Sequence, residues 1–173
     1  MADSFGQETA MDNAVTRRAF IQAAGASALV FWLGRSIGAA AAAERFEVVH
    51  SREEWARLLT PQQFAVLREA ATERPGTSPL NKEHRRGTFL CAGCTLPLFS
   101  SRTKFESGTG WPSFYAPLRN AVRTRSDSSL LETRTEVHCR RCGGHLGHVF
   151  DDGPPPTGKR YCMNGVAMTF RPG

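Results

Sequence analysis

The stretch CRRCGGHLGHVFDDGP (residues 139–154) opens with a C-x-x-C pair, and CAGC (residues 91–94) supplies a second pair earlier in the chain. Two-residue spacing lets both sulfurs of a pair turn toward one ion, and two pairs provide the four-sulfur tetrahedral shell that zinc prefers. The sequence therefore predicts a structural zinc site that closes the base of the long segment between the pairs. Its expected ligands are Cys91, Cys94, Cys139 and Cys142.

Two other arrangements of these cysteines stay open at the level of sequence. Each pair could close as a disulfide in an oxidising compartment. The second pair could also bind a metal together with His145 and His148, while the first pair forms a disulfide. Zinc on four cysteines is favoured, because a chain that folds in the reducing cytoplasm has its thiolates available for the metal.

The body of the chain reads as mainly β. All ten prolines lie after residue 43, and short strand candidates follow one another between turn signals. Because strands so close in sequence can pair only through short connections, we expect antiparallel sheets. The candidates are residues 88–91, 96–100, 118–122, 133–139, 146–150, 160–164 and 166–170.

Two helices are predicted ahead of the strands. Ser51 with Glu54 forms a capping box, and Thr60 with Gln63 forms a second one with a proline at the first helical position. Residues 64, 67 and 71 then follow helical spacing, so the helices should lay an apolar stripe on a sheet. Residues 72–87 read as an extended polar linker.

The first 43 residues read as a targeting signal. VTRRAFIQAAGASALVFWLG (residues 15–34) joins two adjacent arginines to an apolar run, and small residues at 39–43 offer cleavage sites. This layout predicts a twin-arginine export signal that the export machinery recognises, and a periplasmic domain over residues 44–173. An uncleaved signal that anchors the protein is the alternative, although the apolar run is short for a membrane span.

Charge and length limit the other possibilities. The formal net charge is +6, but the basic residues are scattered along the sequence, so we expect no nucleic-acid partner. The predicted mature part has the length of one domain with a modest core, and we expect a monomer.

Cys162, in RYCMN, is left over after the two pairs. Alternate residues of a strand share a face, so Arg160, Cys162 and Asn164 should point the same way. The arginine would stabilise the thiolate, which is the reactive form of a cysteine. A buried, unreactive cysteine is the alternative reading. His145, His148 and Trp111, the last within SGTGWPSF, are further candidates for the same site.

Taken together, these segments resemble the methionine-R-sulfoxide reductases of the B type. The resemblance runs from about residue 51 to residue 170. It rests on LTPQQF, TERP, CAGC, LFSSRTKFESGTGWPSF, CRRCGGHLGHVFDDGP and RYCMN.

The resemblance implies a fold of two small antiparallel sheets with peripheral helices, stapled by zinc on the four paired cysteines. It also implies that Cys162 attacks the sulfur of a methionine sulfoxide, with His145 or His148 as proton donor and Asn164 as a positioning amide. Trp111 and Phe150 would form the apolar wall for the substrate's methyl group. The expected substrate is oxidised methionine in proteins, with free methionine sulfoxide also open.

Thr109 departs from the family pattern. Many members carry a second, resolving cysteine within the SGxGWPSF segment, where this chain has Thr109. With four sulfurs on zinc, the sulfenic acid formed at Cys162 would need an external thiol. That thiol could come from a thioredoxin-like protein, a membrane-linked relay or a small molecule.

Two rival functions remain. A zinc-stapled binding module could have kept the fold and lost the enzyme activity. The missing resolving thiol is an argument for it, and so is Gly165, where the resembled family usually has a serine. A zinc hydrolase would need an open position on the metal, and four sulfurs close that shell.

Overall fold

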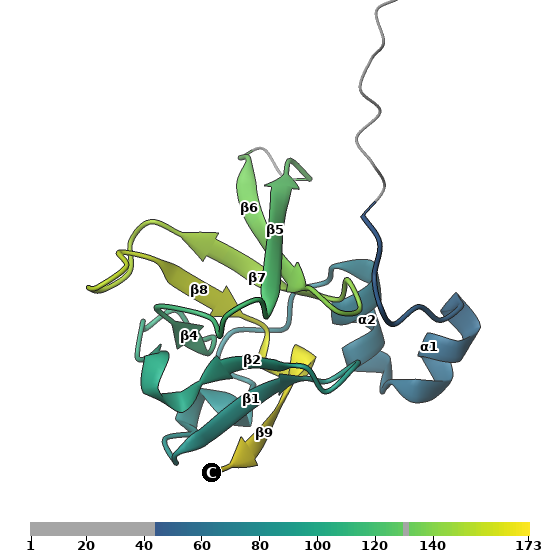
Figure 1. Ribbon diagram of the computed structural model, residues 1–173. Helices are drawn as coiled ribbons and strands as arrows, with labels where there is room; N and C mark the ends of the chain where they lie inside the picture. Colours follow the sequence, from purple (N-terminus) through teal and green to yellow (C-terminus); the bar gives the residue numbers. More distant parts are fainter. Residues whose placement is uncertain (1–43, 130–131) are drawn as a thin grey trace, which may run out of the picture. The chain divides into compact units, whose positions relative to one another are not determined.

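A computed structural model describes residues 44–129 and 132–173, which belong to one unit of the chain (Figure 1). The predicted export signal over residues 1–43 lies outside the described residues. None of the helices within the described part combines the length and the hydropathy that a membrane span requires.

Both predicted helices are confirmed, together with their capping boxes. α1 spans Arg52–Leu58 and α2 spans Pro61–Glu69. At the start of α1, the Ser51 hydroxyl accepts from the Glu54 amide, and the Glu54 carboxylate accepts from the Ser51 amide. Trp55 of α1 and Leu67 of α2 are buried in the core. These contacts dock the N-terminal segment on the strands that follow.

The strands form two antiparallel sheets, as predicted. A three-stranded sheet has the order β2-β1-β9 and a six-stranded sheet has the order β3-β4-β8-β7-β6-β5. Figure 1 draws both sheets with the two helices to one side. The bounds are β1 Gly87–Cys91, β2 Pro97–Ser100, β3 Lys104–Phe105, β4 Ser113–Phe114, β5 Val122–Asp127, β6 Arg134–Cys139, β7 His145–Phe150, β8 Arg160–Met163 and β9 Met168–Pro172. Short 3-10 turns cover Pro79–Lys82 (η1), Ser101–Thr103 (η2) and Gly165–Ala167 (η3).

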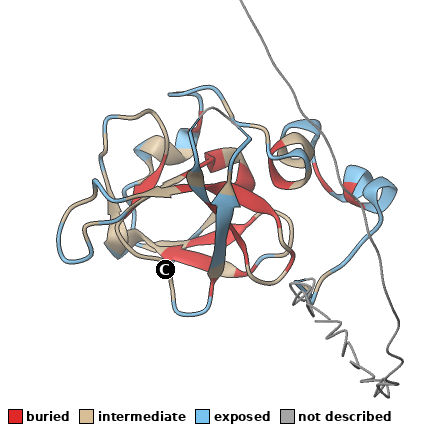
Figure 2. Cartoon of the chain, turned by 90° about the horizontal axis from the view of Figure 1, so that it is seen from above, coloured by how far each residue is buried: buried red, intermediate tan, exposed pale blue. Residues whose placement is uncertain are grey.

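Aromatic side chains join the two sheets. Phe114 of β4 stacks on Phe99 of β2, with ring centroids 4.3 Å apart, and meets Phe89 of β1 edge-on at 4.9 Å. All three rings are fully buried, and such pairs add roughly 0.5–1.5 kcal/mol beyond their area burial. Figure 2 shows the buried residues concentrated in the strands, whereas α1 is largely exposed.

Two sequence predictions need correction. Residues 118–121 form a turn, in which Asn120 has a positive φ of 55° and the Ala121 amide bonds to the Leu118 carbonyl. The strand instead covers Val122–Asp127, an edge strand with mostly exposed, polar residues. Its sequence therefore lacks the apolar alternation from which strands are recognised. The segment over residues 72–87 is also more than a linker, because it contains η1 and contacts the candidate site.

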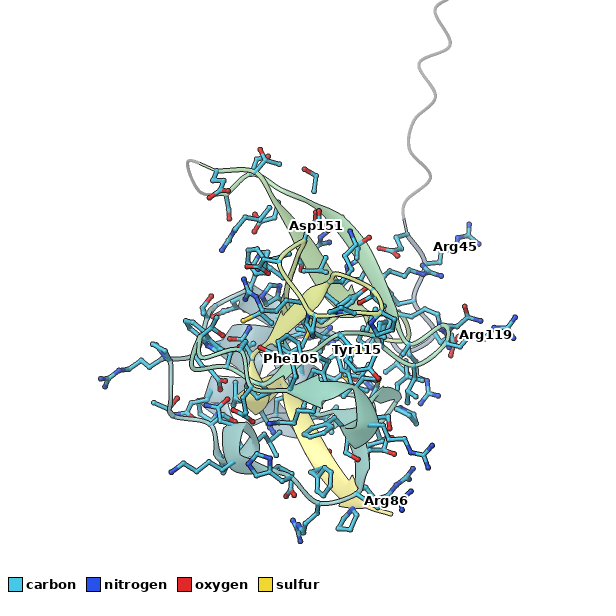
Figure 3. The ribbon with its side chains drawn as sticks, turned by 90° about the vertical axis from the view of Figure 1, so that its left-hand side faces the viewer. Arg45, Arg86, Phe105, Tyr115, Arg119 and Asp151 are labelled. Atoms are coloured by element: carbon cyan, nitrogen blue, oxygen red, sulfur yellow. The ribbon has the colours of Figure 1, made fainter. Side chains whose placement is uncertain are left out.

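Exposed arginines are distributed over the described surface. Arg45, Arg86 and Arg119 lie on separate parts of it (Figure 3). This distribution agrees with the scattered basic residues of the sequence.

Candidate functional site

One row of residues crosses the six-stranded sheet through the leftover cysteine. Cα pairing places Cys162 of β8 opposite Ser113 on one side and opposite His148 on the other. His148 of β7 is opposite Glu136 of β6, and Glu136 is opposite Arg125 of β5. Side chains of directly opposed residues share one face of a sheet, so this row gathers sulfur, imidazole, carboxylate and guanidinium groups.

A small cavity of about 110 Å³ contains Cys162. Its volume suits the end of one side chain rather than a folded segment. A larger cavity of about 690 Å³ lies among α2, η1 and η3 and does not include Cys162. The small cavity is lined by Thr72, Trp111, Arg134, Gly147, His148, Phe150, Cys162 and Asn164.

Gly147 allows β7 to approach β8 beside the cysteine. A Cβ atom at this position would lie 2.2 Å from the carbonyl oxygen of Cys162. The backbone φ of Gly147 is also positive, at 154°. Any other residue would therefore separate the two strands at the point where His148 and Cys162 face each other.

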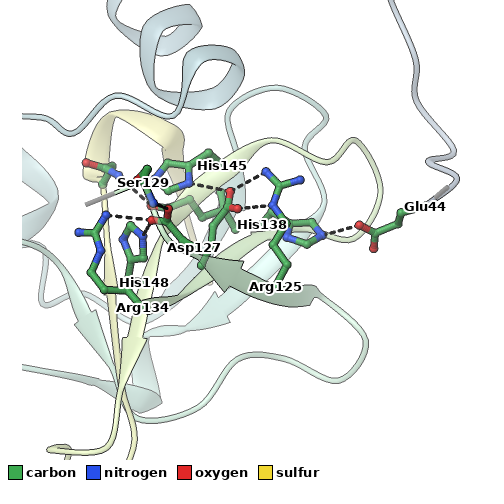
Figure 4. Close-up of polar contacts among 11 residues, drawn as sticks. Glu44, Arg125, Asp127, Ser129, Arg134, His138, His145 and His148 are labelled. Carbon is green, nitrogen blue, oxygen red and sulfur yellow. Dashed lines mark hydrogen bonds and ion pairs between the residues drawn. The ribbon is translucent and has the colours of Figure 1, made fainter. Parts of the chain in front are cut away.

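His148 is held by Asp127. His148 Nε2 lies 2.7 Å from Asp127 Oδ2, which also accepts from Arg134 at 2.9 Å (Figure 4). Hydrogen bonds from Ser129, then from His148 and Arg134, hold the pKa of Asp127 well below its usual range. Since an ionised carboxylate only accepts, Nε2 carries a hydrogen and donates it to Asp127. This leaves Nδ1 as the other nitrogen of the imidazole.

Burial sets the charge state of His148. Burial, the largest influence, lowers the pKa of His148, while the hydrogen bond to Asp127 opposes this change. The nearby Arg134 lowers the pKa further. The imidazole is therefore mostly neutral at neutral pH.

His145 occupies a neighbouring cavity instead of the one that contains Cys162. Its Nδ1 lies 2.8 Å from Glu136 Oε1, and its ring centroid is 5.4 Å from that of His148. The neighbouring cavity, about 260 Å³, also includes Asp127 and Arg125. Burial raises the pKa of Glu136, but hydrogen bonds from His145 and Arg125 outweigh it and lower that pKa to about 2.

Arg160 lies near the sulfur but has another partner. Its guanidinium donates to both oxygens of Asp152, at 2.8 and 2.7 Å, and stacks 4.3 Å over the ring of Phe150. Asp152 is the first cause of the raised pKa of Arg160, and Cys162 contributes less. Asp152 is therefore the main partner of its positive charge.

Glu73 joins two predicted site residues. Its amide donates to Asn164 Oδ1 at 2.9 Å, and its carbonyl accepts from Trp111 Nε1 at 3.1 Å. The Glu73 carboxylate accepts from the amides of Gly165 and Val166. Asn164 Nδ2 also donates to the Leu146 carbonyl at 3.1 Å. The side chain of Asn164 therefore links residue 73 to β7, and one hydrogen of Nδ2 is left for the cavity.

Thr109 directly contacts the cysteine. Its hydroxyl oxygen lies 3.6 Å from Cys162 Sγ. The position that holds a resolving cysteine in many members of the resembled family is thus within reach of Cys162. Asp127, Glu136 and Glu73 were not predicted as site residues from the sequence, and neither were the serines at 107 and 113. Asp127 and Glu136 lie on strands whose residues meet the histidines only through sheet pairing, which a linear sequence does not display.

The four paired cysteines form one cluster. Each sulfur lies within 4.8 Å of the other three. Two of the separations, Cys94 to Cys139 at 3.5 Å and Cys91 to Cys142 at 3.7 Å, join sulfurs from different C-x-x-C pairs. All of the cysteines are free, so no disulfide closes within either pair in the described chain. The histidines proposed for a mixed metal site bond to carboxylates instead.

The geometry of this cluster fits a tetrahedral metal. Zinc–sulfur bonds of about 2.3 Å place the sulfurs of a tetrahedron roughly 3.8 Å apart. Both knuckles also have the same backbone bonds: the Thr95 amide donates to the Cys91 carbonyl, and the Gly143 amide donates to the Cys139 carbonyl. Since Cys91 ends β1 and Cys139 ends β6, a bound ion would tie the two sheets together.

Arg68 of α2 contacts the same cluster. It donates to Cys142 Sγ at 3.3 Å and to the Cys142 carbonyl at 3.0 Å. Its guanidinium also stacks 4.2 Å over the ring of Trp55. The N-terminal helices are thereby connected to the clustered sulfurs.

Comparison with known proteins agrees with this geometry. Residues 59–172 match the family model of the SelR domain. The chain is 54% identical over 125 residues to the peptide methionine sulfoxide reductase MsrB of Methanosarcina barkeri, covering 72% of this chain and 88% of that protein. The protein of the same name from Pseudomonas putida is 56% identical over 122 residues, 69% and 91% of the two chains. The protein of that name from Leptospira interrogans is 51% identical over 127 residues, which cover 73% of this chain and 97% of that protein.

Proposed function

Since the chain belongs to the SelR-domain family of B-type peptide methionine sulfoxide reductases, which are oxidoreductases, we propose that it reduces methionine-R-sulfoxide in oxidised proteins to methionine. The main support is the position of Cys162 in a small cavity, opposite His148 and beside Trp111 and Phe150. Such an activity would serve protein repair under oxidative stress. Free methionine sulfoxide is a further candidate substrate, because the cavity suits a side chain.

The first step transfers oxygen from one sulfur to another. Cys162 sulfur attacks the sulfur of the sulfoxide, while the sulfoxide oxygen gains a proton. The oxygen ends on Cys162 as a sulfenic acid, and methionine leaves as a thioether. The thiol hydrogen balances the hydroxyl hydrogen of the sulfenic acid, so the step needs no net proton.

His148 is the proposed proton donor of this step. It faces Cys162 across the β7–β8 pair, whereas His145 lines the neighbouring cavity. In its protonated form, Nδ1 of His148 would supply the proton, since Nε2 is held by Asp127. Trp111 and Phe150 would form the apolar wall against the methyl group, and Asn164 would position the sulfoxide through its second amide hydrogen.

An external thiol completes the proposed cycle. The first thiol attacks the sulfenic acid, forms a mixed disulfide with Cys162 and releases water, and a second thiol then frees Cys162 as the external disulfide leaves. Thr109 provides no sulfur, and the other four cysteines are gathered in their own cluster. A thioredoxin-like protein, a membrane-linked relay or a small thiol could act as the donor.

Zinc is the metal we propose for the four-cysteine cluster, one ion per chain. Four sulfurs at tetrahedral spacing suit zinc and leave no open position, so its part would be structural. We also propose that residues 1–43 direct export by the twin-arginine route to the periplasm, or anchor the protein if uncleaved. The support is the arginine pair and apolar run of residues 15–34. A monomer is the proposed state.

Turnover with separated epimers tests the proposed activity. Dithiothreitol is the reductant, because it bypasses any natural donor. We expect reduction of the R epimer by the wild-type protein and none by Cys162→Ser, with zinc content and circular dichroism unchanged. Lack of turnover by a folded, zinc-loaded wild type would favour a binding module instead. Activity retained in Cys162→Ser would move the nucleophile to another residue.

A further inference from the structure

A chain of hydroxyl groups ends at the sulfur of Cys162. Thr109 Oγ1 lies 3.6 Å from Cys162 Sγ and 2.8 Å from Ser107 Oγ. Ser107 Oγ lies 2.7 Å from Ser113 Oγ. Ser113 Oγ in turn lies 3.1 Å from the main-chain oxygen of Trp111. Four oxygens therefore connect a backbone carbonyl to the proposed nucleophile.

The carbonyl fixes the direction of each hydrogen in this chain. A carbonyl oxygen cannot donate, so the hydroxyl hydrogen of Ser113 points to Trp111. Ser113 must then accept from Ser107, and Ser107, having donated its one hydroxyl hydrogen, must accept from Thr109. The Thr109 amide also donates to Ser107 Oγ, at 3.4 Å, which agrees with Ser107 as an acceptor on that side. Thr109 is left with a lone pair facing the sulfur.

We propose that Thr109 accepts a hydrogen bond from the thiol of Cys162 and thereby favours the protonated form of the nucleophile in the resting enzyme. Ser107 and Ser113 are positioning residues that orient the Thr109 hydroxyl. A thiolate at the same place would face a lone pair. It could receive a hydrogen from Thr109 if that hydroxyl turned away from Ser107, or if all three hydroxyls reversed; the first change would break the bond to Ser107 and the second the bond to the Trp111 carbonyl. The inference rests on the proposed role of Cys162.

Charged groups on the other elements around Cys162 act separately from the hydroxyl chain. His148 lies opposite on β7, Arg160 precedes Cys162 on β8, and Arg134 reaches the cavity from β6. The carboxylates that pair with them are Asp127 and Asp152. None of these side chains bonds to Ser107 or Thr109 among the described contacts, so substitutions at 107 and 109 leave their hydrogen bonds in place.

The pH dependence of Cys162 alkylation tests the proposal. Iodoacetamide is applied to the zinc-loaded protein without substrate, and mass spectrometry follows the peptide that contains Cys162. In Thr109→Val and in Ser107→Ala, the midpoint pH of alkylation should fall by about half a unit to one unit, the equivalent of one hydrogen bond. In Thr109→Ser, which keeps the hydroxyl, the wild-type midpoint should be retained.

The sign of the shift decides between two orientations. A higher midpoint in Thr109→Val would mean that Thr109 donates to the sulfur, and an unchanged midpoint would mean that the contact has no effect; both overturn the proposal. If the midpoint pH shifts in Thr109→Val but not in Ser107→Ala, Ser107 does not orient the Thr109 hydroxyl. Thr124→Val, an exposed threonine of β5, is the matched control and should match the wild type.

This measurement is independent of the proposed reaction. Alkylation needs no sulfoxide, so a wild type that fails to reduce sulfoxide would contradict the proposed function and still give an interpretable midpoint. Thermal unfolding of each variant, followed by circular dichroism, confirms that the protein compared is folded.

Discussion

Cys162 and His148 lie directly opposite each other on β8 and β7. Opposed residues of antiparallel strands have Cβ atoms about 4.5–5.5 Å apart, which brings an imidazole beside the sulfur with no help from a flexible loop. The proposed nucleophile and its proposed proton donor are thus positioned by the hydrogen-bond register of one sheet. Any slip of that register would separate them.

Replacing each histidine in turn should identify the proton donor. For His148→Asn, we expect kcat with saturating dithiothreitol to fall by about 10²–10⁴-fold, the usual contribution of a general acid. For His145→Asn, kcat should fall much less, because His145 lines the neighbouring cavity. Steady-state kinetics on the R epimer distinguish the two. A larger loss in the His145 variant would transfer the role to that residue.

Asp127→Asn should move the pH profile. The hydrogen bond to Asp127 raises the pKa of His148 against the effect of burial, so loss of the carboxylate should lower that pKa further. If protonated His148 is the acid, activity falls as pH rises through its pKa, and this falling limb should shift to lower pH. The profile of kcat/KM against pH measures the shift. Asp151→Asn, at an exposed residue, is the control. If the falling limb of the profile stays at the same pH in Asp127→Asn, His148 is not the acid.

Thr109→Cys should create an internal resolving thiol. The side-chain atoms of residues 109 and 162 already lie 3.6 Å apart, so a sulfur at 109 could attack the sulfenic acid at once. After one turnover without added thiol, mass spectrometry should find a disulfide between residues 109 and 162. The wild type should instead accumulate a sulfenic acid that forms a mixed disulfide with added thiol. Absence of the internal disulfide would mean that the two side chains cannot reach bonding geometry.

Metal removal should unfold the domain. A strong chelator should release one zinc per chain, with loss of the circular dichroism signal, because the proposed ion would tie β1 to β6. Arg68→Met should speed the release, since Arg68 donates to a ligand sulfur. Arg57→Met, on exposed α1, is the matched control. A metal-free protein of unchanged stability would disprove the structural metal site.

Gly165 and Ser78 should prove energetically coupled. A Cβ at residue 165 would lie 1.9 Å from Ser78 Oγ, and Ser78 is buried while its hydroxyl caps η1. Gly165→Ser should therefore lower the free energy of unfolding by about 1–3 kcal/mol, as overpacking does. Adding Ser78→Gly should recover part of this loss. Denaturant titration of the single and double variants measures the coupling, and purely additive effects would show that the two sites are independent.

The sequence allowed prediction of those features that depend on local spacing. The capping boxes at Ser51 and Thr60 fixed both helices, and the C-x-x-C pairs indicated the cysteine cluster. The prediction of a strand over residues 118–122 was wrong. The strand at 122–127 is an exposed edge strand, whose stability comes from pairing with β6 rather than from an apolar face.

Other features of the site depend on tertiary contacts and could not be inferred from spacing. Glu73 lies in a segment that reads as a linker, and its contacts to Trp111 and Asn164 span 38 and 91 residues of sequence. Asp127 meets His148 because two strands fold side by side, and Ser107 meets Ser113 through the shape of a short loop. The sequence gives the type of each residue but does not indicate which distant residue it contacts.

The hydrogen bonds of Glu73 make the N-terminal segment part of the proposed site. A shortened chain that began after Arg74 would keep the residues of every strand, all the clustered sulfurs and the proposed nucleophile. It would nevertheless lose the acceptor that steadies the indole and the donor that orients the amide of Asn164. The same cut would also remove Trp55 and Leu67 from the core, so N-terminal trimming is expected to weaken folding and the pocket together, and any transplant of this pocket onto a new scaffold must carry residue 73 with it.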